Sequence, residues 1–214
     1  MGNDRRIERR SSGFTLIELL AVIIILSILA FFLLTNLTDV LGTTDVQVTK
    51  ITAQKISAAL HELANDNGDF APSSLPSDLG APPNMDNLGS ESLYVALLAD
   101  GKPGFGLFDE NISNTDDDAL ARRAPGFEVP TLFELCDRWG NPFAYFHWRD
   151  YGREDKYQTL NPETGEAMVS NARAQKNPDT GQYFEPRAFQ LISAGPDGEF
   201  GTEDDIANFK IKKE

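Results

Sequence analysis

The stretch "GFTLIELLAVIIILSILAFFLL" occupies residues 13–34 and is the longest apolar run in the chain. Only Thr15, Glu18 and Ser27 interrupt it with polar side chains. A helix rises about 1.5 Å per residue, so roughly 20 apolar residues are enough to cross the hydrocarbon core of a bilayer. The run therefore predicts a membrane-spanning helix over residues 14–35.

The segment ahead of this run predicts how the helix is oriented. It carries Arg5, Arg6, Arg9 and Arg10, which outnumber its acidic residues. Arginines beside a span stay on the cytoplasmic side, so the carboxyl-terminal part is expected in the periplasm. A cleaved secretory signal would have a shorter apolar region followed by a small-residue cleavage site, and residues 31–40, "FFLLTNLTDV", offer no such site.

Glu18 is the feature that an ordinary membrane anchor does not explain. An acidic side chain inside a span costs roughly 2.5–3.5 kcal/mol at the centre of the bilayer, and less near its edge. Such a residue is expected to have a function and a partner. A buried carboxylate that faces an ammonium group is partly compensated, whereas a carboxylate left alone is not.

The segment "GFTLIELLAVIIILSILA", residues 13–30, resembles the processing site of type IV pilins and type II secretion pseudopilins. The resemblance implies that a prepilin peptidase cuts after Gly13 and that the new amino terminus, Phe14, is N-methylated. It also implies that Glu18 pairs with the Phe14 amine of its own or a neighbouring subunit in the core of a filament. Residues 1–13 would then be a cleaved basic leader.

Helical spacing continues beyond the apolar run and predicts a periplasmic half of the same helix over residues 36–67. Apolar side chains recur there at offsets of three and four, a spacing typical of a helix face that packs on a domain. They are Ala53, Ile56, Leu60 and Leu63. Asn67-Gly68, followed by Pro72, is expected to end the helix.

Residues 68–136 are rich in proline and glycine and are read as a variable loop region with one short helix over 90–100. The run Asp116, Asp117 and Asp118 invites a metal-site interpretation. Adjacent side chains point in different directions, however, so we interpret the three aspartates as a solvated loop or helix start.

Residues 137–214 are expected to form a small antiparallel sheet. Alternating and aromatic-rich segments predict strands over 143–148, 187–193 and 205–211. Between the first two strands lie "NPETGE", residues 161–166, and "NPDTGQ", residues 177–182, which predict two turns of similar chemistry. His147 is expected to face water or a partner strand rather than to bind a metal.

The stretch "SAGPDGEFGTEDDI", residues 193–206, combines acids with glycines, a composition that suits calcium as well as it suits an exposed turn. It also resembles the calcium loop of major type II pseudopilins. That resemblance implies side-chain ligands at three positions and carbonyl ligands at three others, with Glu203 as a spare acid. The implied ligands are Asp197, Asp204 and Asp205 through side chains, and Ala194, Glu199 and Thr202 through carbonyls.

Composition excludes several classes of protein. The formal net charge of −14 argues against nucleic acid as a partner, because a nucleic-acid binder must neutralise phosphates. The single cysteine, Cys136, excludes an internal disulfide and is interpreted as a buried apolar residue. The two histidines, His61 and His147, lie in unrelated contexts, so a histidine-based active site or zinc site is not expected.

Together these features predict an α+β protein, with a long amino-terminal helix packed on a small antiparallel sheet that carries a calcium loop. The resemblance implies a structural, non-enzymatic subunit of a type II secretion pseudopilus, closest to the major pseudopilin. Its expected partners are further copies of itself in a filament, other pseudopilins, the prepilin peptidase and the inner membrane. The alternatives are a minor type IV pilin-like protein, a membrane-anchored periplasmic binding module that does not polymerise, and a membrane-tethered enzyme.

Overall fold

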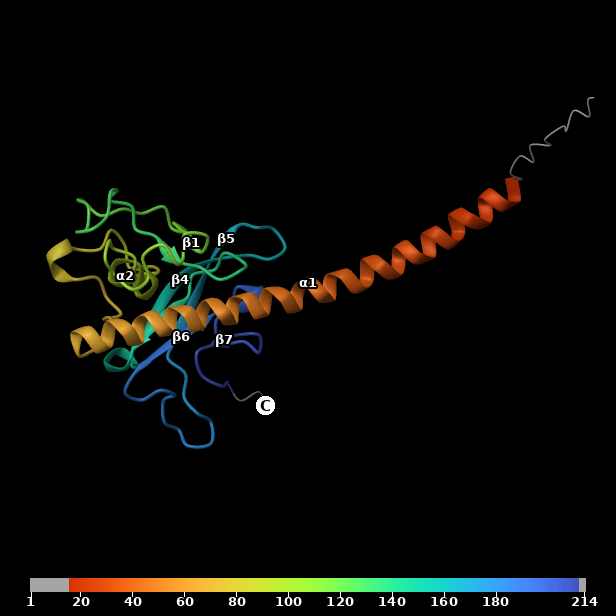
Figure 1. Ribbon diagram of the computed structural model, residues 1–214. Helices are drawn as coiled ribbons and strands as arrows, with labels where there is room; N and C mark the ends of the chain where they lie inside the picture. The colour runs from red at the N-terminus through yellow and green to blue at the C-terminus, as the bar shows by residue number, and fades with distance from the viewer. Residues whose placement is uncertain (1–15, 212–214) are drawn as a thin grey trace, which may run out of the picture. The chain divides into compact units, whose positions relative to one another are not determined.

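The computed structural model describes residues 16–211, and within the first helix it describes the side chains of residues 16–31 and 44–67. The chain divides into two compact units, Met1–Thr43 and Thr44–Glu214. Helix α1 (Leu16–Asn67) contributes residues to both units. The expected α+β class is confirmed, because α1 is followed by a shorter helix and small antiparallel sheets (Figure 1).

In the first unit, the described side chains of α1 from Leu16 to Phe31 are all exposed. Most of them are apolar, and the large ones are between 47% and 84% exposed. The Ser27 hydroxyl donates a hydrogen bond to the Ile23 carbonyl one turn earlier, at 2.7 Å, which satisfies this polar group within the helix. Among the residues that the structure describes, no helix combines the length and apolar character that crossing a membrane requires.

In the second unit, the carboxyl-terminal part of α1 packs through the expected apolar stripe. Ile56 and Leu60 are fully buried, and Ala53 and Leu63 are at most 6% exposed. They share one core with aromatic and aliphatic side chains of the sheet, among them Tyr145. The helix ends where the sequence predicts it, since Gly68 adopts a φ of 82° and its N–H donates to the Ala64 carbonyl at 2.8 Å.

The sheet beneath α1 has three strands in the order β3 (Ala144–His147), β6 (Phe189–Ser193) and β7 (Ile206–Ala207). All neighbours are antiparallel. Two strand predictions are confirmed closely, and the third is confirmed in place but is shorter than expected. Directly after β7, Asn208 pairs with Leu191 through both backbone and side chain: its N–H donates to the Leu191 carbonyl at 3.1 Å, and its Oδ1 accepts the Leu191 N–H at 2.8 Å.

A second hairpin, β4 (Glu154–Leu160) and β5 (Ala167–Arg173), was not expected from the sequence. The two similar turns that the sequence predicts are confirmed. One joins β4 to β5, and the other follows β5. In each, the first asparagine accepts a backbone N–H two residues later, at 2.9 Å, through its side chain, and a glycine N–H donates to its carbonyl at 2.8 Å.

The region between α1 and the sheet contains more structure than a loop. Its elements are η1 (Ser77–Leu79), α2 (Leu88–Leu97), β1 (Ile112–Ser113) and β2 (Glu134–Leu135), and the later short helices are η2 (Trp148–Asp150) and η3 (Gly195–Asp197). Helix α2 confirms the short helix predicted over 90–100. The helix packs very close to the sheet at Gly89: a Cβ atom at this position would lie only 2.4 Å from the Tyr145 carbonyl oxygen.

Two side chains that invited a chemical interpretation have structural roles. Cys136 is buried as expected, and burial raises the pKa of its thiol well above the usual value. The expectation for His147 was partly wrong, because its side chain lies inside the domain and is 3% exposed. It pairs across the sheet with Phe189, and its Nε2 lies 3.2 Å from the Asp69 carboxylate, which gives the buried ring a polar partner.

Candidate functional site

The amino-terminal site is described only in part. Gly13 and Phe14, the predicted processing site, lie outside the described residues. Glu18 lies in the first turn of α1, where a carboxylate interacts favourably with the positive end of the helix dipole. The geometry of the described residues therefore accommodates Glu18 near the helix start, and its pairing with the Phe14 amine stays a prediction.

The predicted calcium loop folds between η3 and β7, and its three aspartates lie close together. One Asp204 carboxylate oxygen accepts the Asp197 N–H at 3.2 Å. The Thr202 hydroxyl contacts the same carboxylate and lies 3.3 Å from the Glu199 carbonyl oxygen. Glu203, which was expected to be a spare acid, is exposed. The carbonyl ligands at Ala194, Glu199 and Thr202 stay predictions.

Asp205 is the most buried carboxylate of this loop. Its Oδ2 accepts the Gly201 N–H and the Gln175 side-chain amide, both at 2.9 Å, whereas its Oδ1 is buried without a hydrogen-bond partner. Burial raises the pKa of Asp205 to about 7, and repulsion by Asp204 and Asp197 acts in the same direction. The folded loop therefore contains a carboxylate that a nearby positive charge would stabilise.

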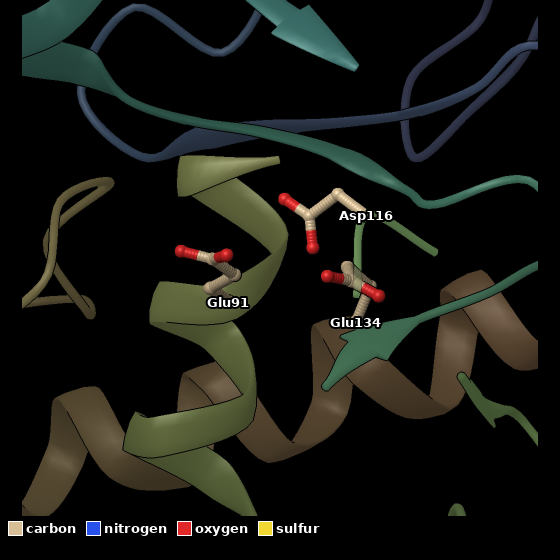
Figure 2. A group of neighbouring side chains, drawn as sticks. All are labelled: Glu91, Asp116 and Glu134. Carbon is tan, nitrogen blue, oxygen red and sulfur yellow. The ribbon is translucent and has the colours of Figure 1, made fainter. Parts of the chain in front are cut away.

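A second group of acids lies inside the domain, and we call it the interior acid cluster: Glu91, Asp116, Asp118 and Glu134. Glu91 comes from α2, Glu134 from β2, and the two aspartates from the loop between β1 and β2. Figure 2 shows the carboxylates of Glu91, Asp116 and Glu134 gathered in one space between these elements. One oxygen from each of the three lies within 4.8 Å of the others.

Neighbouring amides orient the carboxylates of the interior acid cluster. The Asn84 side chain donates to Oδ2 of Asp116 at 2.9 Å and to Oδ2 of Asp118 at 3.3 Å. The Thr115 N–H donates to Oε2 of Glu134 at 2.8 Å. Three other oxygens, Glu91 Oε1, Asp116 Oδ1 and Asp118 Oδ1, are buried without a hydrogen-bond partner.

The electrostatics of the interior acid cluster oppose ionisation. Burial, together with the charges of Asp116 and Asp118, raises the pKa of Glu134 to about 8. Burial also raises the pKa of Glu91, of Asp118 and of Asp116. Repulsion within the cluster adds to the shifts of Glu91 and Asp118, and repulsion by Asp86 adds to that of Asp116. None of the ion pairs found among the described residues includes these four side chains.

The sequence did not reveal this cluster, and the interpretation of residues 116–118 as a solvated loop was wrong for two of them. Asp118 is 8% exposed and Asp116 is half-buried, whereas Asp117 is exposed with a φ of 57°. The argument that adjacent side chains diverge is thus confirmed, since the middle aspartate points out and its neighbours point in. The other members come from distant parts of the chain, so no local pattern signals them.

The amino terminus of the chain matches a known protein family. Residues 9–34 match the family model described as the prokaryotic N-terminal methylation motif. The chain is prepilin-like at its amino terminus. It is also 25% identical, over 206 residues, to the type II secretion system core protein G of Escherichia coli (strain K12), in an alignment that covers 95% of this chain and 94% of that protein. No solved structure matches the prepilin-like chain.

These findings confirm the resemblance that residues 13–30 indicate. The methylation motif spans the glycine, the phenylalanine and the glutamate on which the resemblance depends, namely Gly13, Phe14 and Glu18. The similarity to core protein G extends far beyond this motif, because it covers 95% of the chain. The prepilin-like chain is therefore similar to a pseudopilin through its head domain as well as through its amino terminus.

Proposed function

We propose that the protein is a pseudopilin, a structural subunit that assembles into a type II secretion pseudopilus and performs no catalytic step. The observation that carries this proposal is the extent of the similarity to core protein G, which covers 95% of the chain. A membrane-anchored binding module could share the methylation motif alone. Similarity through the head domain favours a filament subunit over that alternative.

The proposed route to the filament begins at the inner membrane. The prepilin peptidase would cut after Gly13, and Phe14 would become the methylated amino terminus. Residues 14–35 would hold the subunit in the membrane with its head domain in the periplasm. The exposed apolar surface of α1 between Leu16 and Phe31 supports this step, because such a surface requires either lipid or neighbouring subunits to cover it.

In the proposed filament, Glu18 compensates the positive charge of a Phe14 amine. Both groups would lie in an apolar core of packed helices, formed by copies of this chain and by other pseudopilins. A charge pair in such a core is tolerated because each group removes most of the desolvation cost of the other. Loss of either partner would leave one charge buried alone.

The loop at residues 193–206 is proposed to hold a structural calcium ion. Asp197, Asp204 and Asp205 would supply carboxylate oxygens, and Ala194, Glu199 and Thr202 would supply carbonyls. The buried Oδ1 of Asp205, which has no hydrogen-bond partner, supports this assignment, because a cation would satisfy it. All of these donors are oxygens, the ligands that calcium prefers.

Two measurements test the proposed function: the intact mass of the processed subunit and its recovery in sheared filaments. Intact-mass analysis of protein extracted from cells with an active prepilin peptidase should show loss of residues 1–13 and the gain of one methyl group. Shearing of cells that overexpress the subunit should release it as filaments. Recovery of the uncut chain alone, or of a processed chain that never enters the sheared fraction, would contradict the proposal.

A further inference from the structure

We propose that the interior acid cluster, Glu91, Asp116, Asp118 and Glu134, is a second calcium site, separate from the loop at residues 193–206. The two sites use different elements, since the cluster is built from α2, β2 and the loop between β1 and β2. The cluster site does not depend on the proposed function, because it concerns the head domain alone.

The spacing of the oxygens fits one calcium ion. Calcium binds carboxylate oxygens at about 2.3–2.6 Å, so two ligands on opposite sides of one ion lie about 4.6–5.2 Å apart at most. The chosen oxygens of Glu91, Asp116 and Glu134 all lie within 4.8 Å of one another. One ion between them would therefore need only a small movement of the side chains, and Asp118 lies close enough to contact Glu91.

Glu91 is buried, and one of its carboxylate oxygens has no hydrogen-bond partner, which independently indicates a ligand. This side chain is 1% exposed, and its Oε1 has no hydrogen-bond partner. Figure 2 shows its carboxylate beside those of Asp116 and Glu134. An ionised carboxylate only accepts hydrogen bonds, so a buried oxygen without a donor is costly unless a cation or a proton satisfies it.

The donors around the cluster leave the remaining oxygens available. Asn84 holds Oδ2 of both Asp116 and Asp118, and in each of these carboxylates it is Oδ1 that lacks a partner. Glu134 is oriented from both sides, because its Oε2 accepts the Thr115 N–H at 2.8 Å and its Oε1 accepts the Asn87 side-chain amide at 3.4 Å. Hydrogen bonds of this kind orient metal ligands in characterised sites, where outer residues hold one atom of a ligand and the metal takes the other.

Protons are the alternative to a cation. Glu91 and Asp118 are close enough to share one proton. One shared proton leaves most of the buried oxygens without a partner, however, since Glu91 Oε1, Asp116 Oδ1 and Asp118 Oδ1 all lack one and no ion pair among the described residues includes these side chains. A divalent cation offsets two negative charges and can contact several of these oxygens at once. The donors are all oxygens, which favours calcium over zinc, and several protein carboxylates around one ion are typical of calcium, whereas magnesium usually keeps several waters.

The test uses the full chain in detergent micelles, stripped of metal by a chelator, with calcium chloride as the probe. The Asp205→Asn substitution first removes the loop site, so that the remaining calcium response belongs to the cluster. Calcium at ten times its dissociation constant should then still raise the melting temperature by about 3–6 °C. Disappearance of the entire calcium response with Asp205→Asn would overturn the proposal.

Glu91→Gln, added to Asp205→Asn, should abolish the remaining rise. Asp117→Asn is the matched control, because Asp117 belongs to the same loop but is exposed, and it should leave the rise unchanged. Asp118→Asn serves as a second variant if Glu91→Gln does not fold. A calcium response that survives either substitution would refute the site.

Discussion

Replacement of Ile56 by alanine should destabilise the head domain far more than the same replacement at Ile51. Both residues lie on α1, five positions apart, but Ile56 is fully buried whereas Ile51 is 51% exposed. The change in intrinsic helix propensity is the same at the two sites, so the difference between them isolates packing against the sheet.

The magnitude follows from what Ile56 loses. The substitution removes three carbon atoms from a core shared with Leu60, Tyr145 and Phe189. At about 0.8 kcal/mol per buried methylene, the transfer term is roughly 2.4 kcal/mol. The cavity left behind adds to this, which places the total at about 3–4 kcal/mol, within the range of about 2–5 kcal/mol for such changes. We expect less than about 1 kcal/mol at Ile51.

Tryptophan fluorescence during urea denaturation would measure both variants. The chain has two tryptophans, Trp139 and Trp148, and both lie in the second compact unit, so the signal reports unfolding of the head domain and not of residues 1–43. Equal losses at Ile56 and Ile51, or a larger loss at Ile51, would show that the helix does not pack through the face described.

Three further predictions concern charged groups. Glu18→Ala should leave processing intact but reduce the sheared filament yield, because an unpaired Phe14 amine in the filament core costs about 3–5 kcal/mol. Asp204→Ala should abolish the stabilisation that the loop at residues 193–206 gains from millimolar calcium, whereas Glu203→Ala, at an exposed acid, should not. Burial raises the pKa of Asp137 to about 6, so the folded state binds its proton more tightly than the unfolded state does. Its contribution of about 3 kcal/mol is present below about pH 4 and is lost as the pH rises through 6, and Asp137→Asn should remove this part of the pH dependence of the urea midpoint.

Each of these predictions has a clear contrary result. Equal filament yields from wild type and the Glu18 variant would mean that the charge does not serve assembly. A calcium response as large in Asp204→Ala as in wild type would remove Asp204 from the ligand set, and a response reduced by Glu203→Ala would mean that Glu203 is not a spare acid. A urea midpoint that falls between pH 4 and pH 6 as steeply in the Asp137 variant as in wild type would mean that other carboxylates cause the fall.

The sequence predicts those elements whose pattern is local. The stripe that contains Ile56 shows a period of three and four, and the segments that become β3 and β6 are rich in apolar and aromatic residues. The end of α1 was also predictable, because Gly68 is a strong helix stop. In each case the signal lies within a few residues, and burial of an apolar face is enough to select the structure.

The hairpin of β4 and β5 was missed because its buried positions are largely polar. Strand β4 buries Asp155, Tyr157 and Thr159, and only the tyrosine reads as a core residue. Asp155 is tolerated there because Arg153 pairs with it, at 2.6 Å between Nε and Oδ1. A pattern of apolar residues cannot detect a strand whose inward side chains are satisfied by charge pairing.

The two candidate sites also differ in how far the sequence predicts them. The acids of the loop at residues 193–206 are close in sequence, so the sequence shows them together, although it does not show that Asp205 is the buried one. Glu91 and Glu134 are far apart in sequence and meet only because α2 and β2 pack side by side. The topology of the chain brings these two residues together, so their spacing in the sequence does not predict that they are close.

Gly89 has a consequence for how this domain tolerates change. A side chain there would meet the Tyr145 carbonyl oxygen at 2.4 Å and the Tyr157 hydroxyl at 2.5 Å. Shortening Tyr157 to phenylalanine would relieve the second clash, but the first involves backbone, which no substitution can remove. Position 89 therefore tolerates only glycine as long as α2 packs against the sheet. Loops and surface positions of the domain are not restricted in this way.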